Sequence, residues 1–91
     1  MAVTVKLPTQ LRDVTGGQAE VSGQGATVGE VLESVYGQFD GLRDRISDGD
    51  GGLRRFVNVY VDGEDVRFLD GLETPVAENG EVNVLPAVAG G

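Results

Sequence analysis

The feature that most constrains the fold is an amphipathic helix predicted over residues 27–39. Thr27 and Glu30 have the spacing of a capping box, in which two side chains satisfy the free amides at a helix start. Apolar residues then recur at helical spacing, at Val28, Val31, Leu32, Val35 and Phe39. Such a stripe must be buried, and because this is the one clear helix in the chain, we expect the stripe to lie on a sheet.

Little further helix is expected after this segment. Gly41 is a plausible stop. Leu42 and Ile46 stand four residues apart and could add one turn. Residues 48–52, which read Asp-Gly-Asp-Gly-Gly, predict a flexible loop.

Two strands are predicted before the helix. Val3, Val5 and Leu7 alternate with polar residues, the pattern of a strand with one buried face, and Pro8 ends it. Residues 18–22 alternate in the same way, with Ala19 and Val21 as the apolar members. We expect this second strand to return beside the first as a hairpin, with its end at Gly23 and Gly25.

The strands after the helix begin with the strongest one, at residues 55–61, whose valines share one face. Asp62-Gly63 is a hairpin turn signal, and residues 66–68 predict a short return strand. An irregular segment follows, whose apolar residues are expected to plug one end of the core: Leu72, Pro75 and Val76. Residues 78–80 predict another turn, and a final strand follows from Glu81, with Val82 and Val84 inward and Asn83 and Leu85 outward.

This order of elements predicts a single α+β domain spanning residues 1–91, with one main helix packed on one face of a mixed sheet of four to five strands. The first hairpin and the later strands lie on either side of the helix in sequence. A right-handed crossover between parallel strands is therefore expected.

Composition excludes several kinds of function. The 91 residues contain no cysteine, no histidine and a single lysine, Lys6, so the usual nucleophiles, general bases and soft metal ligands are missing. Self-contained catalysis is not expected, and neither is a metal site. A net charge of −8 opposes binding to nucleic acid and to anionic membranes, and it favours an electropositive protein partner. The alternating N-terminus does not resemble a signal peptide, and no apolar run is long enough to span a membrane, so a cytoplasmic location is expected.

Two glycine-containing stretches predict turns or loops. Residues 23–28 resemble the opening of a dinucleotide fingerprint, but Val28 stands where the third glycine is required. Residues 48–50 resemble the start of a calcium loop, but Leu53 occupies the position of the required glycine and arginines follow.

The end of the sequence is the most informative part for function. Pro86 predicts that regular sheet pairing ends there, and a flexible tail of about residues 87–91 follows: Ala87, Val88, Ala89, Gly90 and Gly91. Fully extended, these five residues could reach about 16 Å from the body, enough to enter an active-site channel. Glycine has no Cβ, so Gly90 and Gly91 could pass a narrow constriction and place the Gly91 α-carboxylate beside a bound nucleotide.

An apolar docking patch is predicted near this tail. Phe56 and Tyr60 face away from the valines of their strand, and Leu85 of the last strand shares their face. Exposed apolar patches usually mark interaction sites, with aromatic side chains as anchors. The alternative is that Phe56 or Tyr60 folds over an edge of the core.

Three segments together resemble the ubiquitin-like sulfur carriers of the ThiS/MoaD group: residues 55–61, residues 62–68 and the ending Leu-Pro-Ala-Val-Ala-Gly-Gly at 85–91. Within that group the carriers of actinobacterial cysteine synthesis are the most similar. The resemblance covers nearly the whole chain and implies the β-grasp fold.

The resemblance also implies a function and partners. An E1-like adenylating enzyme would use ATP to activate the Gly91 carboxylate, and a sulfur donor would convert it to a thiocarboxylate. That group would then add to an aminoacrylate on a PLP-dependent cysteine synthase, and a zinc metallopeptidase would release cysteine. Gly90 is the implied channel residue, Pro86 to Ala89 form the tail, and the carrier binds no cofactor.

Two alternatives stay open, of which the first shares the proline-containing ending. One is the small subunit of a molybdopterin synthase, which donates sulfur to the molybdenum cofactor. The other is a ubiquitin-like protein modifier, since a single lysine argues only against chains built on the modifier itself. A plain interaction module is the remaining reading.

Overall fold

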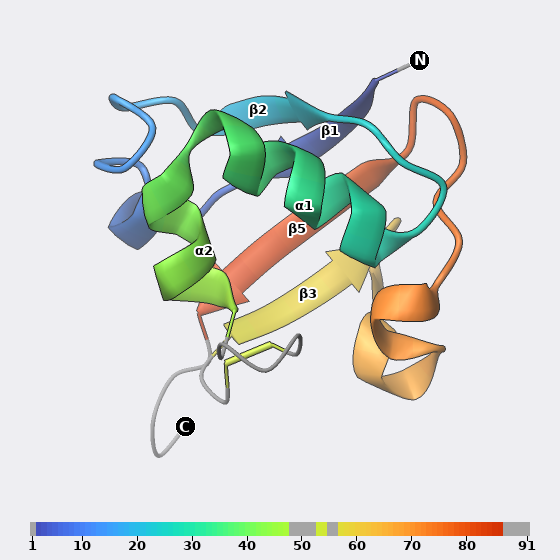
Figure 1. The fold of residues 1–91 in the computed structure, drawn as a ribbon. Coiled ribbons are helices and arrows are strands. Elements are labelled where there is room, and N and C mark those ends of the chain that lie inside the picture. Colours follow the sequence, from blue (N-terminus) through green and yellow to red (C-terminus); the bar gives the residue numbers. More distant parts are fainter. Residues whose placement is uncertain (1, 48–52, 55–56, 87–91) are drawn as a thin grey trace.

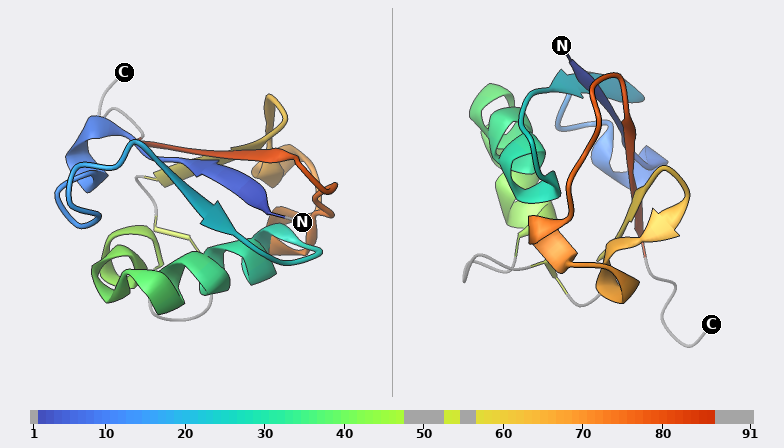
Figure 2. Two further views of the ribbon diagram at one scale, coloured as in Figure 1. Left: turned by 90° about the horizontal axis from the view of Figure 1, so that it is seen from above. Right: turned by 90° about the vertical axis from the view of Figure 1, so that its right-hand side faces the viewer.

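The computed structural model describes residues 2–47, 53–54 and 57–86. Its strands are β1 (Val3–Lys6), β2 (Glu20–Gly23), β3 (Val57–Val61), β4 (Glu64–Asp65) and β5 (Glu81–Pro86). Two α-helices, α1 (Val28–Gln38) and α2 (Asp40–Ile46), lie on the same side of the sheet (Figures 1 and 2). Three 3-10 turns complete it, namely η1 (Thr9–Leu11), η2 (Val66–Phe68) and η3 (Gly71–Glu73). The α+β, β-grasp prediction is confirmed.

The sheet has the order β2-β1-β5-β3-β4. β1 pairs antiparallel with β2 and parallel with β5, so the expected parallel pair is present. β5 also pairs antiparallel with β3. The last strand of the chain is therefore the central strand of the sheet, held by neighbours on both sides (Figure 1).

Helix α1 forms where the capping box predicts it. Thr27 Oγ1 accepts a hydrogen bond from the Glu30 amide at 3.3 Å, and Glu30 Oε1 accepts one from the Ala26 amide at 2.9 Å. Its core-facing side chains are buried, at Val28, Val31, Leu32, Val35 and Tyr36. The helix thus covers the inner face of the sheet through the predicted stripe.

The prediction that Gly41 stops the helix is wrong. The break comes earlier, at Phe39 (φ −137°, ψ 89°), and Gly41 lies inside α2. A Cβ at Gly41 would lie 2.8 Å from Val14 Cγ1, so this glycine permits close packing rather than ending a helix. The further turn predicted from Leu42 and Ile46 is confirmed, since both are fully buried in α2.

The β3–β4 hairpin confirms the Asp62-Gly63 turn, with positive φ angles of 49° and 92° at these residues. The strand predicted at residues 66–68 is wrong. β4 ends at Asp65, whose carboxylate caps the next three residues by accepting from the Arg67 amide at 2.8 Å. They form η2, in which Val66 alone is buried.

The second strand is displaced from its prediction. β2 begins at Glu20, Ala19 is exposed, and the inward positions are Val21 and Gly23. Helix α1 contacts the outer edge of β2 through a hydrogen bond in which Gln38 Nε2 donates to Ser22 O at 2.7 Å.

The core lies between the inner sheet face and the helices. The predicted inward residues in and next to β1, β3 and β5 are buried, namely Val3, Val5, Leu7, Val57, Val59, Val61, Val82 and Val84. At one end, Val76 is buried and Leu72 packs against the core, as expected. Pro75 forms a bridge with Thr27 at this end. The loop predicted at 48–52 lies outside the described residues.

Candidate functional site

The candidate site is the end of β5, where the chain reaches the predicted tail. Pro86 is the last described residue and is still opposite Val57 of β3. The tail residues Ala87, Val88, Ala89, Gly90 and Gly91 lie outside the described residues, and so does Phe56. What the structure defines is the strand that leads to the tail and the surfaces around its end.

The outer face of the sheet carries two of the three predicted docking residues. Leu85 is 44% exposed and lies opposite Asn58, while Tyr60 is half-buried and lies opposite Asn83. This register makes Leu85 and Tyr60 diagonal neighbours, with backbones about 7–8 Å apart. The two apolar side chains therefore share a face that is otherwise polar.

Beside Leu85, three polar side chains of this face form a network that the sequence did not reveal. Lys6 Nζ lies 3.0 Å from Glu81 Oε1, and Asn83 Nδ2 donates to Glu81 Oε2 at 2.8 Å. The hydrogen bond to Glu81 raises the pKa of Lys6. The hydrogen bonds from Asn83 and then from Lys6 lower the pKa of Glu81. The only lysine is thus a paired ammonium rather than a free amine.

An apolar cavity of about 200 Å³ lies at this end of the sheet. Its lining includes the apolar side chains of Leu11, Val57 and Leu85 and two arginines, Arg45 and Arg54. Arg54 Nε donates to Asp44 O at 2.7 Å, and Arg45 lies 3.7 Å from Asp13. One arginine of this lining is thus paired with a carboxylate, and the other is bonded to a backbone carbonyl.

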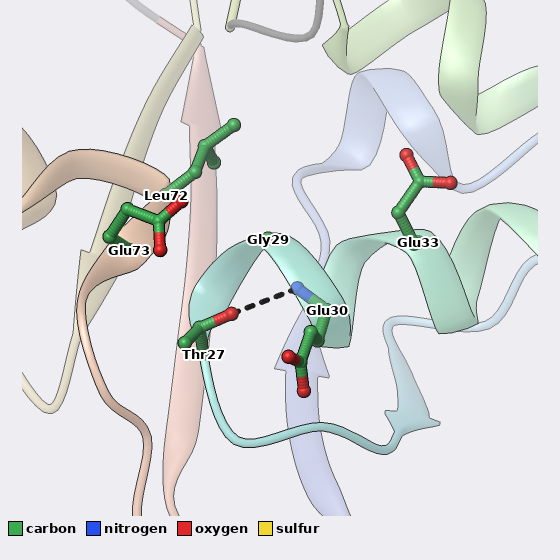
Figure 3. A pocket seen from close by; sticks show the side chains of 6 residues that line it. All are labelled: Thr27, Gly29, Glu30, Glu33, Leu72 and Glu73. Atoms are coloured by element: carbon green, nitrogen blue, oxygen red, sulfur yellow. Dashed lines mark hydrogen bonds between the residues drawn. The ribbon is translucent and has the colours of Figure 1, made fainter.

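A larger cavity, of about 450 Å³, lies at the start of α1 against η3 (Figure 3). Three carboxylates line it, those of Glu30, Glu33 and Glu73. Glu30 caps the helix, and Glu33 binds Arg43 through two hydrogen bonds of 3.0 and 3.1 Å. These negative groups disfavour a phosphate at this helix start, which agrees with the prediction that residues 23–28 form a turn rather than a dinucleotide site.

Within residues 2–47, 53–54 and 57–86 there is no group of three or more side chains suited to hold a metal ion. In the same part of the chain no helix has the length and apolar character needed to cross a membrane.

Comparison with known proteins decides the family. The model of the ThiS family matches residues 5–91. The chain belongs to the ThiS family. The sulfur carrier protein CysO of Mycobacterium tuberculosis is 50% identical over 93 residues, covering 100% of both chains.

Two further relatives broaden the ThiS-family comparison. A chain in the crystal structure of the Amycolatopsis orientalis BexX/CysO complex matches with a TM-score of 0.91 and 48% identity, covering 99% of this chain and 100% of that one. Small archaeal modifier protein 3 of Haloferax volcanii is 44% identical over 66 residues, covering 72% of this chain and 71% of that one.

This ThiS-family member is a ubiquitin-like sulfur carrier rather than an enzyme. The resemblance read from residues 55–68 and 85–91 is therefore confirmed. The roles predicted for Gly91, Gly90 and the docking residues stay predictions.

Proposed function

We propose that the chain carries sulfur as a thiocarboxylate on Gly91 and donates it for cysteine biosynthesis. The observation that supports this most is the 50% identity to CysO over the whole of both chains. The same match supports a single domain spanning residues 1–91, with a tail at about 87–91.

The chemistry needs the folded domain only to present the chain end. A carboxylate is a poor electrophile, so an E1-like enzyme joins a Gly91 oxygen to the α-phosphate of ATP and pyrophosphate leaves. A hydrosulfide ion from the sulfur donor then attacks the acyl carbon, AMP leaves and the remaining proton is lost, which gives the thiocarboxylate. ATP is a substrate of the activating enzyme, and the carrier itself supplies no cofactor.

The downstream partners follow from the cysteine reading. The thiocarboxylate sulfur adds to an aminoacrylate on a PLP-dependent cysteine synthase, the adduct rearranges to an amide, and a zinc metallopeptidase cleaves that amide. The register of β5 fits this scheme, because pairing continues as far as Pro86 and leaves five residues beyond it. Extended, these residues span about 16 Å, which is long enough to enter an active-site channel.

Intact mass spectrometry tests the proposal. The protein is incubated with the activating enzyme, ATP and a sulfur donor, and its mass is expected to rise by the difference between sulfur and oxygen. Deletion of Gly91 is expected to abolish the change. A wild-type protein that gains no sulfur would refute the proposal, and sulfur gain without cysteine formation by the synthase would shift the assignment to the molybdopterin branch.

The docking role of Leu85, with Phe56 and Tyr60, is tested in the same assay. Leu85→Asp places a charge on an apolar contact and is expected to raise the carrier concentration for half-maximal conversion about tenfold. Ser22→Asp is the matched control, because it adds the same charge at an exposed position of β2 on the same face. Equal effects of the two changes would show that Leu85 is not a contact.

A protein modifier is the second candidate, favoured by the 44% identity to small archaeal modifier protein 3. In that role the activated Gly91 would form an amide with lysines of other proteins. Covalent ladders on target proteins, instead of free thiocarboxylate and cysteine, would identify this function.

A further inference from the structure

The most exposed large apolar side chain in the described part of the chain is Phe68, at 87%. Its neighbour Leu69 is 40% exposed. Single surface hydrophobics are ordinary, but two adjacent ones with an aromatic ring almost fully in water are typical of a contact surface. Neither residue belongs to the end of the domain that leads to the tail.

The backbone that carries Phe68 is fixed on both sides. Before it, Val66 is fully buried and Arg67 donates to Val57 O at 2.8 Å and to Asn58 Oδ1 at 3.0 Å. After it, the Leu69 amide donates to Val66 O at 3.0 Å. The ring is thus presented by an ordered turn, which lowers the entropy lost when a partner binds it.

A second anchor holds the next turn. The Asp70 amide donates to Thr74 Oγ1 at 3.1 Å, and Thr74 is buried. Phe68 and Leu69 therefore lie between two anchored points, Arg67 of η2 and the Asp70–Thr74 hydrogen bond around η3. We call residues 64–73 the Phe68 platform.

The Phe68 platform is strongly acidic. It contains four carboxylates, those of Glu64, Asp65, Asp70 and Glu73, and one basic residue, Arg67. Because the Arg67 guanidinium is bonded to the start of β3, it does not neutralise the rim around Phe68. The complementary surface is an apolar pocket ringed by lysine and arginine side chains.

The platform begins with the edge strand β4 and continues beside β3, whereas β5 is the central strand of the sheet (Figure 1). β3 starts at Val57, beside Pro86, and ends at Val61, from which the hairpin leads into the platform. The four residue spacings of β3, at about 3.3 Å each, make the strand roughly 13 Å long, and Phe68 lies after the turn at its far end. A partner can therefore hold the platform while the tail occupies an active site.

We propose that the Phe68 platform is a second docking surface, which binds a basic, apolar pocket on the enzyme that activates the carrier. The inference rests on the proposed function. An acyl-adenylate is readily hydrolysed, so the carrier must stay bound between adenylation and sulfur transfer while its terminal group changes. A contact that does not involve the tail provides that retention.

The test measures binding of the full chain to the purified activating enzyme without ATP or sulfur donor, by titration calorimetry at two salt concentrations. Phe68→Ala is expected to weaken binding about tenfold or more. The double variant Glu64→Gln with Asp70→Asn is expected to weaken binding several-fold and to reduce its dependence on salt. An unchanged urea midpoint shows that each variant is folded.

The control for charge is Glu20→Gln with Asp44→Asn. Both double variants change the net charge from −8 to −6, since each removes two carboxylates, but the control leaves the platform intact. It is expected to bind like the wild type. Equal weakening by both pairs, or wild-type affinity of Phe68→Ala for the activating enzyme, would overturn the inference. Failure of the proposed function would give a different result, because the wild type itself would then gain no sulfur in the mass-spectrometry assay.

Discussion

Replacing glycine by alanine is expected to destabilise the fold at Gly23 and to stabilise it at Gly37. Gly23 ends β2 against α1, where a Cβ would lie 2.9 Å from both Val31 Cγ1 and Val31 O and 3.0 Å from Val35 Cγ2. Gly37 is exposed on α1, and a Cβ there would meet nothing within 4 Å. The pair separates a packing effect from the general effect of replacing glycine by alanine.

The size of the Gly23→Ala effect follows from those distances. Ordinary contact begins at 3.4 Å, so a Cβ at 2.9 Å requires α1 to withdraw by about 0.5 Å (3.4 minus 2.9). Val31 cannot yield locally, because its side chain is fully buried and stiff and its backbone oxygen belongs to the helix. Overpacking of this kind costs about 1–3 kcal/mol. Gly37→Ala is expected to stabilise by about 0.5–1 kcal/mol, the gain in helix propensity.

Urea unfolding followed by far-ultraviolet circular dichroism measures both changes, and calorimetry gives the shift in Tm. For a domain of this size, each kcal/mol corresponds to about 4–8 °C. We expect a lower midpoint for Gly23→Ala and a higher one for Gly37→Ala. The reasoning is refuted if Gly23→Ala unfolds at the wild-type midpoint, or if both variants shift in the same direction.

Two further predictions concern titratable side chains. Burial, with the nearby Glu33 carboxylate, raises the pKa of Tyr36 to about 12. The contribution of the neutral phenol to stability is therefore complete below pH 10 and is lost as the pH rises through 12. In Tyr60→Phe, where Tyr36 is the only tyrosine, absorbance at 295 nm should show this titration, and a midpoint near 10 would contradict it. Glu81→Gln is expected to lower the pKa of Lys6 and to speed acylation of its amine by a succinimidyl ester, measured by peptide mass; unchanged rates would mean that the pair does not protect Lys6 in solution.

Sequence periodicity predicted the parts of the fold that are held by burial alone. The stripe of α1 and the alternating valines of β3 and β5 are buried as expected, because the core needs those faces. The failures are local. Val66-Arg67-Phe68 alternates like a strand, but the Asp65 carboxylate caps the Arg67 amide and turns the chain into η2. Gly41 resembles a helix stop in the sequence, but the structure requires glycine there because Val14, which is distant in sequence, packs against it.

The candidate site was predictable only in part. The outward positions of Leu85 and Tyr60 follow from the alternation of side chains along a strand, and the structure places the two residues on one face. Three features were missed: the Lys6–Glu81–Asn83 network, the cavity lined by two arginines and the exposure of Phe68. They depend on which strands become neighbours and on how η2 turns. A local sequence pattern encodes neither the strand pairing nor this turn. The absence of Cys and His, by contrast, limited the chemistry from composition alone.

The central position of β5 has a mechanical consequence. An enzyme that draws on the chain end pulls along a strand bonded on one side to β1 and on the other to β3. Such a load acts in shear on both ladders at once, rather than opening one of them bond by bond from an edge. The body of the carrier is thus built to withstand tension applied along its last strand.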